Sequence, residues 1–291
     1  MAGEEALSGG NTSIVVRVGD TVRRPVGHWT PAVHRLLNHL ARAGFTGAPT
    51  VLGIDGDGRE ILAYVEGEVG TLDATNPLAP WFRTPQACRA VGAWIRSFQN
   101  AQAGLVLDPA EPWRRAPGAT LAPGRVIVHH DVSPYNTVRR SDGSLVVLDF
   151  DFARPGDPIE DLAWAAWRWV PLMAGSGWHG EYGVAPAEDI ERRQHANLAG
   201  LLAGYDPSPD QCRALADAIH EEMVRHAADL DDMAATDAAF ADLVERGYAR
   251  AARADAAWWQ SQRLLPRWCT LLESRPLLES RLGTPALNSD E

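Results

Sequence analysis

The most informative stretch of this chain is Val126–Asp161, with the sequence VIVHHDVSPYNTVRRSDGSLVVLDFDFARPGDPIED. An apolar run at its start gives way to a polar loop that contains Asp131 and Asn136. The turn-forming letters SDGS and a second apolar run follow, and that run ends at Asp149. The pattern therefore predicts two buried strands that bring two carboxylates and one carboxamide to one place.

These three side chains offer hard oxygen ligands. Mg²⁺ binds through one or two carboxylates and completes its shell with water and phosphate oxygens. A carboxylate beside such a site can also orient a hydroxyl and accept its proton. Positioning and charge neutralisation do most of the catalysis in phosphoryl transfer, so the set Asp131, Asn136 and Asp149 points to that chemistry.

The same residues carry a resemblance to a known family. His129, Asp131 and Asn136 match the H-x-D-Φ-x-x-x-N catalytic loop of the protein-kinase-like superfamily, and Asp149 begins a D-F-D where that superfamily has D-F-G. The third position, Asp151, departs from the pattern. The wording HHDVSPYN followed by LDFDFARPGDPIEDLAWAAW resembles the aminoglycoside phosphotransferase family of small-molecule kinases.

This resemblance implies an α+β, two-lobed protein-kinase-like fold. A small β-rich N-terminal lobe would span residues 1–67 and bind the nucleotide. A larger helical lobe would span residues 68–291 and hold the catalytic loop and the acceptor site. The implied reaction moves the γ-phosphate of ATP or GTP, with Mg²⁺, to a hydroxyl of a small molecule.

The resemblance also assigns roles within the central stretch. Asp131 would be the catalytic base, and Asn136 and Asp149 would hold Mg²⁺. His129 would brace the loop, and Asp161 would steady it from below. Simpler interpretations stand beside these roles: Asp131 and Asn136 are common turn and cap residues, and Asp161 is a favourable charge at a helix N-terminus.

Nucleotide binding is expected in the first 67 residues. Gly10 lies in a short GGN segment at the position of the phosphate-covering loop, although a plain hairpin turn explains it equally well. The strand over 21–24 occupies the position of the phosphate-pairing basic residue, for which we favour Arg23 and keep Arg24 as the alternative. Backbone groups from Ala63 to Val65 would hold adenine.

Two absences complicate this assignment. The chain has no lysine, so all 27 residues counted as lysine plus arginine are arginines, and either an arginine does the work of the usual phosphate-binding lysine or no residue does. The helix expected over 30–43 contains no acid to pair with it. Together with Asp151, these departures support an alternative function: a nucleotide-binding, sequestering or immunity module with little transfer activity.

Composition narrows the class of protein. With 45% hydrophobic and 22% charged residues the chain is typical of a globular protein, and a net charge of −11 argues against binding to nucleic acid or anionic membrane. The three cysteines show no paired spacing, and neither a signal peptide nor an 18-residue apolar run is evident. We expect a cytoplasmic monomer or homodimer.

The second lobe is expected to be helical, with helices over 84–103 and from Asp157 onward and a buried tryptophan stripe at Trp164, Trp167 and Trp169. An acidic stretch over 229–245 is interpreted either as a solvated helix face or as a site for the amino groups of a cationic acceptor. The acceptor itself stays open among an aminoglycoside-like antibiotic, choline, homoserine and a sugar.

Overall fold

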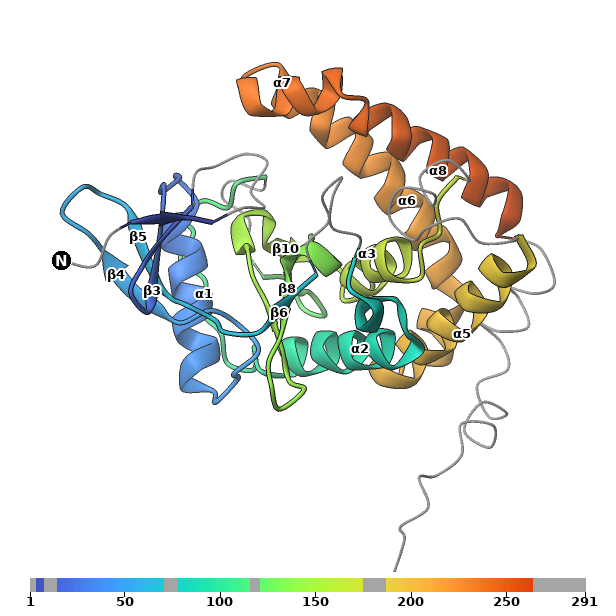
Figure 1. The fold of residues 1–291 in the computed structure, drawn as a ribbon, viewed down its shortest axis with the longest axis horizontal. Helices are drawn as coiled ribbons and strands as arrows, with labels where there is room; N and C mark the ends of the chain where they lie inside the picture. Colours follow the sequence, from blue (N-terminus) through green and yellow to red (C-terminus); the bar gives the residue numbers. More distant parts are fainter. Residues whose placement is uncertain (1–3, 8–14, 71–77, 116–120, 175–186, 264–291) are drawn as a thin grey trace, which may run out of the picture.

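The computed structural model describes residues 4–7, 15–70, 78–115, 121–174 and 187–263, which form a two-lobed α+β structure (Figure 1). A twisted sheet and one helix form the smaller lobe at the N-terminal end. Short strands lie in the middle of the molecule, and long helices form the larger lobe beyond them. The predicted fold class is confirmed.

The sheet of the small lobe is antiparallel throughout, with the strand order β1-β2-β3-β5-β4. Its strands are β1 (Glu5–Ala6), β2 (Val16–Val18), β3 (Thr21–Arg24), β4 (Val51–Ile54) and β5 (Glu60–Ala63). The bounds of β3 agree with the prediction. Asp55 closes the β4–β5 hairpin because its Oδ1 accepts hydrogen bonds from the amides of Asp57 (3.0 Å) and Arg59 (2.8 Å).

Helix α1 (Thr30–Arg42) follows β3 and carries proline in its first turn, where the missing N–H has no cost. Its apolar stripe is buried, at Val33, Leu36, Leu37 and Leu40. The helix contacts both β4 of its own lobe and η3 (Phe150–Phe152) of the larger lobe. It therefore connects the sheet of the smaller lobe with the segment that follows Asp149.

The strands around the predicted catalytic loop belong to two small sheets. β7 (Val126–Val128) pairs with β10 (Arg154–Gly156), and the order β6-β8-β9 joins Glu68–Val69, Thr137–Arg139 and Leu145–Val147. The SDGS turn connects β8 and β9, and β8 is a strand that the sequence pattern did not predict. The loop over 129–136 thus runs from one sheet to the other.

The larger lobe is built on α3, which is buried on nearly every side. Helix α2 packs on α5, while α6 packs on α3 and α8. The bounds are η1 (Pro80–Arg83), α2 (Pro85–Asn100), α3 (Ile159–Trp169), α5 (Ala187–Tyr205), α6 (Pro209–Ala234), α7 (Ala238–Glu245) and α8 (Tyr248–Gln262). The predicted tryptophan stripe lies in this core, since Trp164, Trp167 and Trp169 are at most 3% exposed.

Side chains cap these helices where the sequence predicts their start. Thr84 accepts a hydrogen bond from the amide of Ala87 (3.2 Å) at the start of α2. The helix expected from Asp157 onward begins at Ile159, two residues later. The Asp157 carboxylate accepts from the amide of Ile159 (3.1 Å), and the Glu160 carboxylate accepts in return from the amide of Asp157 (2.8 Å).

Over the described part of the chain, every helix is too short or too polar to cross a bilayer. Cys88 and Cys212 are buried free thiols. Burial raises the pKa of both thiols, so they remain protonated.

Candidate active site

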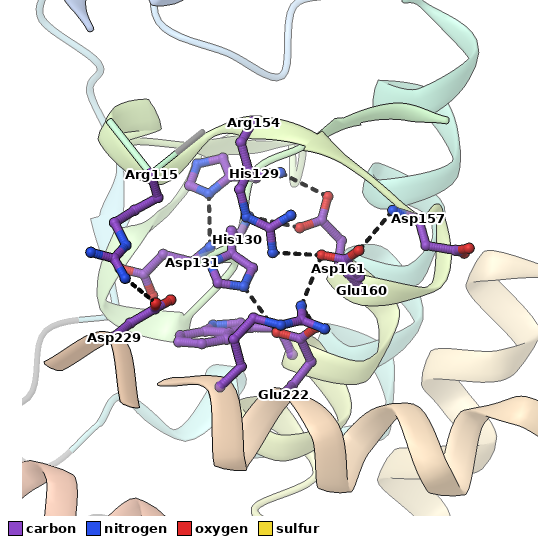
Figure 2. A network of polar contacts seen from close by, with 12 residues as sticks. Arg115, His129, His130, Asp131, Arg154, Asp157, Glu160, Asp161, Glu222 and Asp229 are labelled. Carbon is purple, nitrogen blue, oxygen red and sulfur yellow. Dashed lines mark hydrogen bonds and ion pairs between the residues drawn. The ribbon is translucent and has the colours of Figure 1, made fainter. Parts of the chain in front are cut away.

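The backbone of the loop after β7 is held by one buried carboxylate. Asp161, at the start of α3, accepts hydrogen bonds from the amides of His129 (2.9 Å) and His130 (2.8 Å) with its two oxygens (Figure 2). His130 has the left-handed φ of 63°, a conformation that costs a non-glycine residue about 1–3 kcal/mol. The carboxylate of Asp161 therefore supports a strained turn immediately before Asp131.

The two histidines of the loop face different partners. His129 Nε2 donates to the carbonyl of Leu148 (3.0 Å), and its Nδ1 accepts from the amide of Asp131 (3.2 Å). His130 Nε2 lies 2.9 Å from Glu222 Oε2 on α6. Burial lowers the pKa of His129 to about 4 and that of His130 to about 3, so both rings are neutral braces.

Two of the buried tryptophans reach the same loop. The indole of Trp169 donates to the carbonyl of Val132 (2.9 Å), and the indole of Trp164 donates to Ser133 Oγ (3.0 Å). Both rings belong to α3, so packing of this helix in the core also fixes the loop. The sequence indicated their burial but not these hydrogen bonds.

The carboxylate of Asp131 is surrounded by donors. Ser133 Oγ (2.7 Å) and Tyr135 Oη (3.1 Å) donate to Oδ1, and Asn136 Nδ2 (2.8 Å) donates to Oδ2. Burial raises the pKa of Asp131 to about 6, against the lowering effect of the Ser133 hydrogen bond, and the charge of Asp149 raises it further. A carboxylate with this pKa is ionised at neutral pH and still accepts a proton readily.

Asp149 stands where β9 leaves the sheet, in the left-handed conformation with φ of 62°. Phe150 follows it and packs against the ring of His129 with a centroid separation of 4.3 Å. This ring contact holds the segment after Asp149 against the loop over 129–136. The Asp149 side chain is 42% exposed. It therefore offers a carboxylate to solvent and to ligands.

The structure places Arg24, and not the favoured Arg23, beside Asp149. Arg24 Nη1 donates to Asp149 Oδ1 (3.0 Å), and its Nη2 contacts Asp151 Oδ1. Arg23 lies on the other face of β3, where its Nε is 3.6 Å from Asp55. Alternation along the strand separates the two arginines, and only the register of the folded sheet decides which one faces the second lobe.

Two of the backbone amides expected to hold adenine already donate hydrogen bonds within the protein. The amide of Ala63 donates to the carbonyl of Thr50 (2.9 Å) and that of Tyr64 to the carbonyl of Asp20 (2.9 Å), so neither N–H is available to an adenine ring. Val65 lies directly after these residues and stays a prediction. Gly10 lies outside the described residues.

An ion-pair network supports the loop from the side of α3 and α6 (Figure 2). Glu160 Oε2 forms ion pairs with Arg154 Nη2 (2.7 Å) and Arg225 Nη1 (3.0 Å), and Glu222 Oε1 forms one with Arg225 Nη1 (2.5 Å). Side-chain atoms of His130, Glu160 and Glu222 approach within 4.8 Å, a spacing that could hold a metal ion. The two guanidinium groups already neutralise these carboxylates, so the cluster is a structural network.

Arg114 is a residue of the site that sequence reasoning missed. Its guanidinium lies 4.2 Å from the Trp29 ring of the small lobe and 4.9 Å from the ring of Phe152 after Asp149. It also lies 3.9 Å from Asp151 and 3.7 Å from Asp237. Arg114 thus connects the two lobes at the edge of the site, and no motif marks it in the sequence.

The acidic stretch is largely neutralised by arginines. Five of its carboxylates form ion pairs, namely Asp229 and Asp232 with Arg115, Asp231 with Arg253, Asp237 with Arg114 and Asp242 with Arg246. These pairs come from segments distant in sequence as well as from the same helix. The stretch is therefore not a continuous surface of unpaired carboxylates.

Comparison with solved structures defines the fold class. A choline/ethanolamine kinase family protein from Mesorhizobium loti superposes with a TM-score of 0.57 at 16% identity, covering 97% of this chain and 94% of that one. An aminoglycoside phosphotransferase from Alicyclobacillus acidocaldarius gives 0.50 at 16% identity, covering 90% and 91%. The chain has the protein-kinase-like fold.

The sequence comparisons agree with the resemblance to this family. The model of the phosphotransferase enzyme family matches residues 101–201, which include the predicted catalytic loop and Asp149. The resemblance to the aminoglycoside phosphotransferase family is thereby confirmed. The trifolitoxin immunity protein of Rhizobium leguminosarum bv. trifolii is 35% identical over 170 residues, and this match spans 57% of the chain and 62% of that relative.

Proposed function

We propose that the protein is a small-molecule kinase that transfers the γ-phosphate of ATP or GTP to a hydroxyl group. The observation that carries the proposal is the environment of Asp131. Its carboxylate is held by Ser133, Tyr135 and Asn136, and the half-exposed Asp149 lies close enough to influence its charge. A binding protein without transfer activity has no need of such a base.

In the proposed reaction Asp131 orients the acceptor hydroxyl and takes its proton as the oxygen attacks phosphorus. The bond between the γ-phosphorus and the bridging oxygen breaks, and the nucleoside diphosphate leaves. The pKa of about 6 keeps Asp131 ionised at neutral pH. The Ser133 and Tyr135 hydroxyls hold the carboxylate in one orientation.

Asn136 and Asp149 fit a Mg²⁺ ion by the chemistry of their oxygens. Asn136 donates both of its hydrogen bonds to Asp131 from Nδ2. Neither of these two bonds uses the amide oxygen, which is the atom that would bind Mg²⁺. Bound Mg²⁺ would neutralise charge on the phosphates. Arg24 contacts Asp149 and would supply further positive charge there, in the role that the sequence left open between Arg23 and Arg24.

Acceptor choice is part of the proposal. Antibiotics, choline, homoserine and sugars all present a hydroxyl group. The arginine partners of the acidic stretch reduce the negative charge available to a polycation, so neutral acceptors belong in the screen beside cationic ones.

We also propose that the lobes divide at residues 67 and 68, where β6 begins and joins the sheet of the larger lobe.

A second candidate is an immunity module that binds nucleotide or toxin with little transfer. The 35% identity with a protein named as an immunity protein favours it, as does the contact of Arg24 with Asp149, the residue proposed to bind metal. The two candidates differ in whether Asp131 is needed for function.

A thermal-shift series with Mg²⁺ and ATP, GTP or ADP tests nucleotide binding, because a ligand of the folded state raises the melting temperature. The expected result is a Mg²⁺-dependent rise that Asp149→Asn loses and Asp131→Asn keeps. Asp57→Asn, at an exposed turn, is the matched control. Release of ADP or GDP with candidate acceptors should then require Asp131, and turnover that survives Asp131→Asn would refute the proposed mechanism.

A further inference from the structure

Arg24 has a buried partner that the sequence did not indicate. Strands β3 and β5 place Glu60 opposite Arg24, and Arg24 Nε lies 2.7 Å from Glu60 Oε2. The Glu60 side chain is 3% exposed, and that of Arg24 is 13% exposed. A buried carboxylate needs a partner of opposite charge, and here the partner is the arginine that faces Asp149.

The other oxygen of Glu60 is bound by helix α1. His34 Nε2 lies 2.7 Å from Glu60 Oε1, and the His34 side chain is 17% exposed. Glu60 is therefore held between a strand partner and a helix partner. The missing acid of α1 is replaced by two residues, because the strand supplies the carboxylate and the helix supplies a histidine that holds it.

The geometry leaves the outer nitrogens of Arg24 pointing into the site. A guanidinium group is planar, so fixing Nε also fixes the plane in which Nη1 and Nη2 lie. These two nitrogens contact Asp149 and Asp151. The same pair of donors can bind two phosphate oxygens in bidentate fashion.

We propose that Glu60 and His34 are positioning residues that hold Arg24 in the orientation required to bind the nucleotide phosphates. This inference rests on the proposed function, which supplies the phosphates. Glu60 touches Arg24, and His34 acts on Arg24 through Glu60. Neither residue contacts Asp131, so their effect falls on nucleotide binding.

The neighbouring ion pair provides a matched control. Arg23 on β3 and Asp55 in the β4–β5 turn lie 3.6 Å apart, and the Arg23 side chain has a similar exposure of 16%. Asp55→Asn removes a carboxylate beside an arginine without touching Arg24. Any general effect of losing an ion pair in this sheet should appear in that variant too.

The experiment compares the affinity for Mg·ATP with that for adenosine by calorimetric titration. Adenosine lacks phosphates, so the ratio of the two affinities isolates the phosphate contacts. Arg24→Gln should lower the ratio by about 10–100-fold, the value of one or two hydrogen bonds to charged groups, and Glu60→Gln and His34→Ala by about 5–10-fold. Asp55→Asn should leave the ratio unchanged.

Two further variants separate positioning from a general loss of structure. His34→Gln keeps a side-chain donor toward Glu60 and should restore most of the ratio that His34→Ala loses. Glu60→Gln in the Arg24→Gln background should add no further loss. If Glu60→Gln does not fold, His34→Ala decides, since its side chain reaches the surface and Arg24 keeps its carboxylate.

The outcomes distinguish the inference from the function on which it rests. If Arg24→Gln lowers the ratio and both Glu60→Gln and His34→Ala leave it unchanged, the positioning role is wrong while the proposed kinase stands. A wild-type protein that binds Mg·ATP no better than adenosine overturns the proposed function and this inference with it.

Discussion

Replacing Ser133 with alanine should shift the pH dependence of activity. In the proposed mechanism Asp131 acts in its ionised form, so the rate should fall as pH falls through the pKa of about 6. With that pKa about nine-tenths of the Asp131 carboxylates are ionised at pH 7 and about one-tenth at pH 5. The wild-type rate should therefore fall by about tenfold across this interval.

Ser133 sets part of that value through its 2.7 Å hydrogen bond to Asp131 Oδ1. A hydrogen bond to a charged group contributes about 1.5–3 kcal/mol, and one pKa unit corresponds to about 1.4 kcal/mol. Ser133→Ala should raise the pKa of Asp131 by about one to two units. Tyr135→Phe should raise it by less, since its hydrogen bond is longer, at 3.1 Å, and its side chain is partly exposed.

The assay is the rate of ADP release from Mg·ATP between pH 4.5 and 9, with the best acceptor found in the screen. The carbon-13 shift of the Asp131 carboxyl, assigned by its absence in Asp131→Asn, reports the same titration without turnover. Melting temperatures show whether each variant folds, because Ser133 also accepts the Trp164 indole N–H. An acid limb near pH 4 in the wild type, or one unmoved by Ser133→Ala, would refute the reasoning.

Two further predictions concern stability. Burial raises the pKa of Glu222 to about 7, so the stability linked to its protonated form is complete below its ordinary value near 4.5 and is lost as pH rises through 7. Urea unfolding should therefore show the wild type about 1–1.5 kcal/mol less stable at pH 8 than at pH 6, and Glu222→Gln should narrow this difference. An unchanged difference would contradict the assignment to Glu222. Trp169→Phe removes the indole that donates to the Val132 carbonyl and opens a cavity at a site with 0% exposure, so it should lower the free energy of unfolding by about 2–4 kcal/mol in the same assay. Trp258→Phe, at a half-buried tryptophan, is the control and should cost less than half as much. Equal costs for the two variants would argue against the contact of Trp169 with the loop.

The central motif could be predicted from the sequence because it is local. A short apolar run, the spacing from His129 to Asn136 and an Asp at the end of a second run predict a catalytic loop without any tertiary information. The helix starts at Thr84 and Asp157 and the buried tryptophans were likewise visible, since capping and helical periodicity depend on residues within one or two turns.

The electrostatic partners could not be predicted in the same way. Strand alternation separates Arg23 from Arg24 but does not say which face meets the larger lobe, and the structure brings Arg24 to Asp149. Glu60 follows Arg24 by 36 positions and becomes its neighbour only through the register of β3 and β5. Arg114 and Glu222 reach the site from a connecting segment and from α6, and neither lies in a motif.

The sequence alone predicts the class of chemistry and the loop proposed to carry it, because residue type and spacing along one short segment supply hard oxygen ligands and a candidate base. The tertiary structure decided how those groups are charged and held. Burial moves the pKa of Asp131 to about 6, and the ion pairs of Arg24 connect strand, helix and loop. Burial and long-range pairing depend on the whole packed molecule, so only the folded chain reveals them.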